Sequence, residues 1–232
     1  MKQIKIWGIL CVLMLATNIL GAETKRYEIQ SAIIEYATGS SGNMMGIQTQ
    51  TEGKSKIVFK EWGKVELREE RTRSVIMGKE AHTRQTTKID HDRVYIVDYE
   101  QKIIHQYNPM ALNHSQYKNI AKNAQEMIRS MGGAKTGEET VLGYDCEIWE
   151  TQQIKLWLYK GIMLKSVTTM MGLTQTTEAM TIQMNIPVSD EDLKLPDFPI
   201  KIMQQGDPTQ MPQLTPEQMQ QMQEMMKNFT QK

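Results

Sequence analysis

Any chemistry in this chain would have to come from a few histidines, one internal cysteine and a methionine-rich end. The histidines are His82, His91, His105 and His114, and no two of them have the His-x-x-x-His spacing that places two metal ligands on one face of a helix. The chain also lacks a Gly-x-Ser-x-Gly sequence and a phosphate-binding loop. Adjacent acidic pairs such as Glu69-Glu70 point to opposite faces of a strand. These patterns predict a protein that is not an enzyme and has no cofactor.

Cys146 is the internal cysteine, and it allows two interpretations. It could act as a nucleophile only if a nearby base lowered the pKa of its thiol. Alternatively, it is a small buried side chain in a strand that also contains Ile148. The only other cysteine, Cys11, lies in the N-terminal segment described below. If that segment is removed, no disulfide can form within the chain, and the fold must be stabilised by burial alone.

Methionine is frequent, with 19 residues in the chain, and four cluster near the C-terminus. Met219, Met222, Met225 and Met226 would share one side of a helix that begins at Thr215-Pro216, an N-cap followed by a first-turn proline. Thioether sulfur suits Cu(I), so a metal site made of these four methionines is one hypothesis. The same side could instead dock on an apolar ligand or a partner helix, or have no specific role.

The first 22 residues are typical of a secretory signal peptide. Lys2 and Lys5 precede a short apolar run, and the small residues Gly21-Ala22 precede a polar segment, which predicts cleavage near Ala22 and a periplasmic protein. The apolar run is shorter than the roughly 20 residues that span a bilayer, and no later segment is long and apolar enough. After cleavage, 25 basic side chains remain against 27 acidic ones, so no basic field favours nucleic acid.

The remaining chain is predicted to be rich in antiparallel strands. Short strands separated by turns are expected between Tyr27 and Tyr107, with breaks at residues 38–43, 52–54, 61–64 and 78–79. Asn108-Pro109 then indicates a helix entry, and an apolar stripe from Ile120 to Met131 ends at Gly132-Gly133. Four further strands are expected at residues 144–150, 154–159, 162–170 and 173–184. This order predicts an α+β fold, mainly β, in which one amphipathic helix crosses a curved antiparallel sheet or incomplete barrel.

The predicted organisation has four parts. Residues 1–22 are the signal peptide, and residues 23–187 form the β-rich domain. Residues 188–214 are a proline-containing linker in which Ser189 to Leu193 can form one helical turn. Residues 215–232 are the Met/Gln-rich helix or flexible tail.

Two motifs resemble a known family. Gly143-Tyr144-Asp145-Cys146-Glu147-Ile148-Trp149 is similar to a Gly-x-x-Cys-x-x-Trp strand, and residues 157–165 are similar to a Trp-x-x-x-Gly-x-x-x-Lys hairpin. Both occur in secreted bacterial proteins of unknown function that resemble the periplasmic lipoprotein carriers. Over roughly residues 27–185, the resemblance implies an incomplete barrel closed by helices over an apolar cavity that shields an acyl chain.

The resemblance therefore favours a non-catalytic binding or carrier protein for a lipid or lipoprotein acyl chain. The helix stripe alone fits either a filled core or a cavity. The candidate cavity-lining residues are Ile96, Ile120, Ala124, Met127, Ile128, Met131, Trp149 and Trp157. The alternatives are a Met-based Cu(I)-binding protein and a scaffold for another envelope protein.

Overall fold

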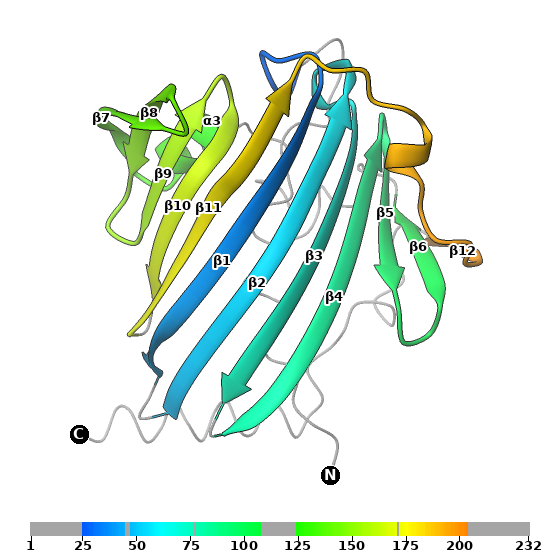
Figure 1. The fold of residues 1–232 in the computed structure, drawn as a ribbon, viewed down its shortest axis with the longest axis horizontal. Helices are drawn as coiled ribbons and strands as arrows, with labels where there is room; N and C mark the ends of the chain where they lie inside the picture. The colour runs from blue at the N-terminus through cyan, green and yellow to red at the C-terminus, as the bar shows by residue number, and fades with distance from the viewer. Residues whose placement is uncertain (1–24, 45–46, 77, 108–123, 171, 204–232) are drawn as a thin grey trace.

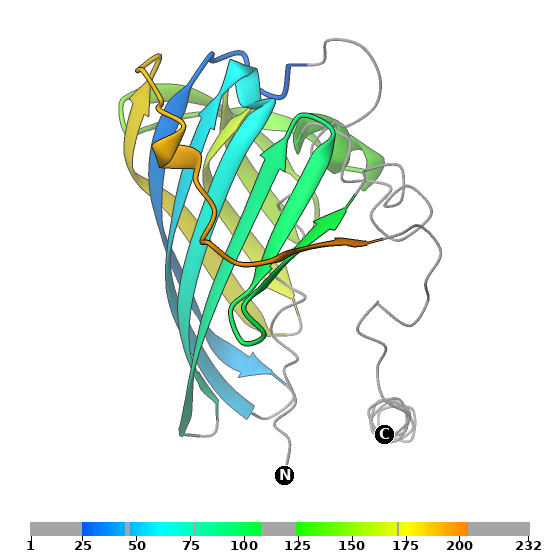
Figure 2. The same ribbon diagram turned by 90° about the vertical axis from the view of Figure 1, so that its right-hand side faces the viewer.

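One open, curved sheet forms the body of the protein (Figures 1 and 2). The computed structural model describes residues 25–44, 47–76, 78–107, 124–170 and 172–203. The order of the twelve strands is β12-β6-β5-β4-β3-β2-β1-β11-β10-β9-β8-β7, and all neighbours are antiparallel except β12 and β6. The strands are β1 (Ala32–Met44), β2 (Ile47–Lys60), β3 (Val65–Ile76), β4 (Lys79–Asp90), β5 (Arg93–Asp98), β6 (Ile103–Tyr107), β7 (Ala134–Val141), β8 (Tyr144–Glu150), β9 (Ile154–Tyr159), β10 (Ile162–Met170), β11 (Leu173–Met184) and β12 (Ile200–Met203).

The predicted fold class is confirmed: the protein is mainly β, the sheet does not close on itself, and the described residues contain one short α-helix. The bounds of β8 to β11 agree with the four strands predicted after the helix. Their turns explain the agreement. At the β9–β10 turn, Lys160 and Gly161 both have positive φ, 49° and 82°, which is the hairpin geometry that matches the twist of the flanking strands.

Two predicted breaks in the first half were wrong. Residues 38–43 continue β1, and residues 52–54 continue β2. The two stretches pair with each other, for example Thr38 with Gly53, so backbone hydrogen bonds override the local turn preference. A Cβ atom added at Gly53 would lie 3.0 Å from Thr72 Cγ2, so this glycine allows a close approach within the sheet rather than a turn.

Other features of the sheet were missed from the sequence. β7 is an exposed edge strand with little apolar alternation, and β12 lies in the segment predicted to be a linker. Tyr27 was expected to begin a strand, but the first ladder starts at Ala32. The central pairing of β1 with β11 joins the two halves of the chain, and its register shifts between Glu35 and Tyr36. No local signal specifies this long-range pair.

The described part of the predicted helix is α3 (Ala124–Ser130). It ends in a Schellman motif, in which the Gly133 N–H bonds the Ile128 carbonyl at 2.9 Å and the Gly132 N–H bonds the Arg129 carbonyl at 3.0 Å. Gly132 has φ 81°, the left-handed geometry that this motif requires, so the predicted stop is confirmed. Among the described residues, no helix is long and apolar enough to cross a membrane.

The convex face of the sheet is covered by the chain that follows β11. The predicted helical turn is confirmed as the 3-10 helix η4 (Glu191–Leu193), which lies outside the curve of the sheet in Figure 2. Leu193 packs against Val58, Val65 and Leu67. Farther along the segment, Leu195 and Phe198 pack against the cluster of Tyr95, Val97 and Ile104. We call residues 188–198 the convex cover.

Candidate functional site

The candidate site is the concave face, which alternation along each strand places opposite the convex cover. In β1 and β2 the side chains on this face are apolar near the end where β1 begins. They include Ala32, Ile34, Tyr36, Ile57 and Phe59, which belong to the largest buried cluster of the protein. Partly buried Tyr27, Met163, Ile182 and Met184 pack against the same cluster. The concave face therefore has an apolar wall at the middle of the sheet.

Helix α3 packs on this face at one side of the sheet (Figure 2). Ile128, which is fully buried, contacts a cluster formed by Trp149, Leu156 and Leu158. Cross-strand pairing joins Leu156 on β9 to Ser166 on β10, then to Thr177 on β11 and Thr38 on β1. Paired residues share a face, so this cluster lies on the same face as the even-numbered side chains of β1. α3 thus covers the concave surface of β8 and β9.

Polar contacts fix α3 to β8. The Glu147 carboxylate accepts hydrogen bonds from Trp149 Nε1 and Gln125 Nε2, both at 2.9 Å, and from Lys135 Nζ at 3.0 Å. The hydrogen bond from Trp149 and then that from Lys135 lower the pKa of Glu147. The Arg129 guanidinium lies 4.7 Å from the centre of the Trp149 ring. Trp149 is therefore held between the helix and its own strand.

The structure brings together some of the predicted cavity residues and separates others. Ala124, Met127, Ile128 and Trp149 lie in one cluster. Met131 is 47% exposed. Trp157 pairs with Ile148 and so points to the opposite face of the β8–β9 hairpin from Trp149, but it belongs to the same buried cluster as the apolar wall of β1 and β2. Ile96 is on β5, toward the other edge of the sheet. Ile120 lies outside the described residues, as do Met219, Met222, Met225 and Met226.

A row of side chains crosses the concave face from β1 to β6. Cross-strand register joins, in order, Ile34, Ile57, Arg68, Thr87, Ile96 and His105. Thr87 is a polar side chain in this row, yet it is only 4% exposed. The strand pattern gave no signal for this row, because only the pairing of distant strands aligns its members. We call Arg68, Thr87 and His105 the polar row.

The polar row contains buried atoms without hydrogen-bond partners. Within the described chain, four buried side-chain atoms lack a partner: Ser55 Oγ, Arg68 Nε, Thr87 Oγ1 and His105 Nδ1. Three belong to the polar row, and Ser55 pairs with Tyr36 one position farther along the same face. A buried polar atom left unpaired costs about 1–3 kcal/mol, so such atoms are rare and are normally satisfied by an ordered water, an ion or a bound ligand.

The N-terminal segment closes one end of the concave face. Tyr27 stacks on Phe59 with ring centres 4.3 Å apart, and its hydroxyl donates to the Glu66 carboxylate at 2.8 Å. Arg26 pairs with the same carboxylate at 3.2 Å, and both side chains are buried. Burial, followed by the Glu66 charge, raises the pKa of Tyr27. Burial alone would lower the pKa of Arg26, but Glu66 and Tyr27 together outweigh this effect, so the pKa of Arg26 is raised.

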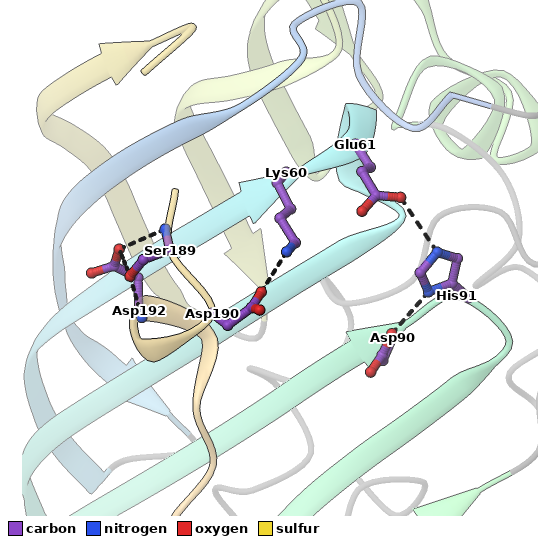
Figure 3. Close-up of polar contacts among 7 residues, drawn as sticks. All are labelled: Lys60, Glu61, Asp90, His91, Ser189, Asp190 and Asp192. Atoms are coloured by element: carbon purple, nitrogen blue, oxygen red, sulfur yellow. Dashed lines mark hydrogen bonds and ion pairs between the residues drawn. The ribbon is translucent and has the colours of Figure 1, made fainter. Parts of the chain in front are cut away.

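The titratable groups near the convex cover are partly or fully exposed and paired with one another (Figure 3). His91 lies between Asp90 at 2.8 Å and Glu61 at 3.4 Å. Lys60 pairs with Asp190 at 2.6 Å. Of the residues that the structure describes, no group of three or more His, Cys, Asp or Glu side chains could hold a metal ion. These contacts are surface ion pairs of small energetic weight.

Cys146 is fully buried in the largest cluster, beside Ile148. Burial raises the pKa of its thiol, which favours the protonated form. The thiol lies 3.5 Å from the Tyr144 carbonyl oxygen. This environment is that of a packed side chain, because a thiol needs a lowered pKa to act as a nucleophile.

The family described as "Domain of unknown function (DUF4412)" matches residues 38–229. No curated protein matches the chain.

Among solved structures, an uncharacterized conserved protein from Thermus thermophilus has a TM-score of 0.41 and 8% identity, over 73% of this chain and 90% of its own. A LolA superfamily protein from Nitrosomonas europaea has a TM-score of 0.34 and 9% identity, over 74% of this chain and 93% of its own. A putative outer membrane lipoprotein-sorting protein domain from Vibrio parahaemolyticus has a TM-score of 0.32 and 12% identity, over 72% and 91%. At these TM-scores the likenesses carry no functional argument.

Proposed function

This chain belongs to the DUF4412 family, whose description names no activity, and from its own geometry we propose that it is a non-catalytic binding protein that holds an apolar molecule on its concave face. The ligand class is a lipid or the acyl part of a lipoprotein. Binding buries apolar surface at roughly 25 cal/mol per Å² and needs no covalent step. We further propose that the protein acts in the periplasm after cleavage near Ala22.

The unequal cover of the two faces carries this proposal. On the convex face, both apolar clusters pack against the chain's own convex cover. On the concave face, the helix among the described residues contacts mainly β8, at one side of the sheet. The apolar wall of β1 and β2 is itself buried, but farther along the strand order the concave face continues to Ile96 on β5, which is only partly buried. A curved apolar surface of this kind fits a ligand that adapts to its shape.

The test is a titration with N-phenyl-1-naphthylamine, a neutral apolar dye that fluoresces on burial. We expect saturable binding that oleyl alcohol displaces. Ile96→Asp places a carboxylate on the concave face and is expected to weaken binding by at least about tenfold, because an apolar ligand cannot pair with the charge. The matched control is Ile202→Asp, which changes a 67% exposed residue on β12.

Two results would contradict the proposal. One is the absence of saturable binding to the wild-type protein at any dye concentration below its solubility limit. The other is an equal effect of Ile96→Asp and Ile202→Asp, since the second residue lies on the side of the convex cover. Native mass spectrometry of the protein from its own cell envelope adds an independent readout, because a retained lipid would appear as a fixed mass increment.

A further inference from the structure

The unpartnered atoms of the polar row share one chemical property: each can donate a hydrogen bond. Arg68 carries a guanidinium, which has five N–H donors and no acceptor. The Thr87 hydroxyl can donate, and so can the His105 ring nitrogen in the appropriate tautomer. Register places Thr87 beside Arg68, and it places His105 one strand beyond Ile96 on the same line. Arg68 and Thr87 are on neighbouring strands, so one group with several acceptor atoms can meet both, whereas His105 is two strands beyond Thr87, roughly 10 Å away.

The protein itself does not supply these acceptors within the described chain. Glu66 is two residues from Arg68 on the same face, but it is already bound by Arg26 and Tyr27. Glu70 is two residues away in the other direction, and among the described residues Arg68 forms no ion pair with it or with any other carboxylate. Tyr36 belongs to the apolar wall, and burial raises the pKa of its hydroxyl. The charge of Arg68 opposes this shift, because the guanidinium is close to the wall. Arg68 is thus a cation beside an apolar surface.

The row combines this polar group with apolar neighbours. Ile57 lies beside Arg68 toward the middle of the sheet, and Ile34 lies beside Ile57. On the other side, Ile96 separates Thr87 from His105. A molecule with an oxygen-rich anionic head and an apolar tail matches this arrangement of polar and apolar side chains. Its head would meet Arg68 and Thr87, and its tail would lie on the concave face toward the partly exposed Ile96, because Ile34 and Ile57 are already buried, at 1% and 7% exposure.

We propose that Arg68 and Thr87 of the polar row bind the carboxylate or phosphate head group of an amphipathic ligand whose tail occupies the concave face. The inference rests on the proposed function and defines its ligand class more closely. It explains why the sheet keeps unpaired donors in a buried position: charge-assisted hydrogen bonds to an oxyanion satisfy them when the ligand is bound.

The experiment compares oleate with oleyl alcohol, which share one chain and differ in the head group, as competitors of N-phenyl-1-naphthylamine. We expect the wild-type protein to bind oleate at least about tenfold more tightly than the alcohol, since one charge-assisted hydrogen bond accounts for such a ratio. Arg68→Met and Thr87→Val are each expected to reduce this ratio, and Arg68→Met to abolish it while keeping the affinity for the alcohol. Arg71→Met is the matched control, because Arg71 is an exposed residue of the same strand on the convex face.

The outcomes separate the two proposals. Equal affinities for oleate and the alcohol in the wild type, or an unchanged ratio in Arg68→Met, would overturn the head-group site and leave apolar binding intact. Inorganic phosphate is titrated alone as the third arm, and binding as tight as that of oleate would overturn the amphipathic ligand in favour of a free anion. Failure of both oleate and the alcohol to bind would instead refute the proposed function. Removal of an unpaired buried donor should not lower the thermal midpoint of the ligand-free protein, so misfolding does not mimic the result.

Discussion

The two faces of the same sheet are covered in different ways. The convex cover contacts both edges of the apolar surface beneath it, from Val58 and Leu67 to Tyr95 and Ile104. On the concave face, α3 buries the β8–β9 side, and Arg26 and Tyr27 close one end. Among the described residues, the buried atoms without partners all lie on the concave face. Both faces show apolar alternation, so it is the unsatisfied polar groups that distinguish the proposed binding face from the structural one.

The largest effect is expected at the closed end of the concave face. Glu66→Gln removes the charge that pairs with buried Arg26, and we expect a loss of about 3–5 kcal/mol in the free energy of unfolding, because a buried charge is left uncompensated. Urea denaturation measures this loss. Adding Arg26→Met should restore much of it. Lys60→Met breaks an exposed pair and is the control for an ordinary ion pair. Equal losses in Glu66→Gln and Lys60→Met would show that the closed end is not specially stabilised.

The second prediction concerns the convex cover. Leu193 is 1% exposed, and Leu193→Ala is expected to lower the free energy of unfolding by about 2–4 kcal/mol through lost burial and a cavity. If the convex cover is purely structural, the affinity for N-phenyl-1-naphthylamine stays at the wild-type value at temperatures where the variant is folded. Met180→Ala, at a 60% exposed position, controls for loss of an apolar side chain without burial. A changed affinity in Leu193→Ala would remove the distinction between the two faces.

The sequence predicted much of the fold because its strongest signals are local. Turns such as Lys160-Gly161 and the glycine stop after α3 depend on neighbouring residues only, and both are confirmed. The predicted breaks near Gly39 and Gly53 failed because the two stretches pair across β1 and β2. β12 could not be predicted, since a four-residue edge strand is defined by its parallel partner β6.

The candidate site was less predictable than the fold. The helix stripe predicted a buried face, and Ile128 is fully buried, since a 3.6-residue period identifies a buried face without knowledge of its partner. Trp149 and Trp157 were grouped together because both flank one hairpin. Trp149 pairs with Leu156, however, and Trp157 pairs with Ile148, so the two indole rings lie on opposite faces of the hairpin. The polar row required the register of four separate strands, β3 to β6. That information depends on tertiary pairing.

A smaller effect is expected for the cover of the concave face. Ile128→Val removes one methylene group from a fully buried position and should cost about 0.5–1.5 kcal/mol. Unlike Leu193→Ala, it changes the surface beside the proposed ligand, so the affinity for N-phenyl-1-naphthylamine should change measurably. In Ile128→Val, amide hydrogen exchange should become faster in α3 than in the wild type, whereas exchange in η4 should stay the same. Unchanged affinity together with unchanged exchange in α3 would indicate that this helix belongs to a closed core, as the convex cover does.

The smallest effect concerns the pH dependence of α3 attachment. Hydrogen bonds from Trp149 and Lys135 lower the pKa of Glu147, so the folded state favours its carboxylate. A group whose pKa is lowered by folding contributes stability above its unfolded pKa, and the contribution disappears as the pH falls through the lower folded value. The side chain is 39% exposed, so solvent screening keeps the contribution small.

Glu147→Gln tests this pH dependence. The difference in thermal midpoint between the wild type and Glu147→Gln should be largest near neutral pH and should shrink as the pH falls below the ordinary glutamate value of 4.5. Exchange of the Trp149 indole N–H should accelerate over the same pH range, because this group donates to Glu147 at 2.9 Å. The exposed carboxylate of Asp192, whose pKa is lowered by hydrogen bonds from Ser189, provides a matched Asp192→Asn control on the convex side. A pH-independent difference in Glu147→Gln would mean that shape, rather than charge, attaches α3 to β8.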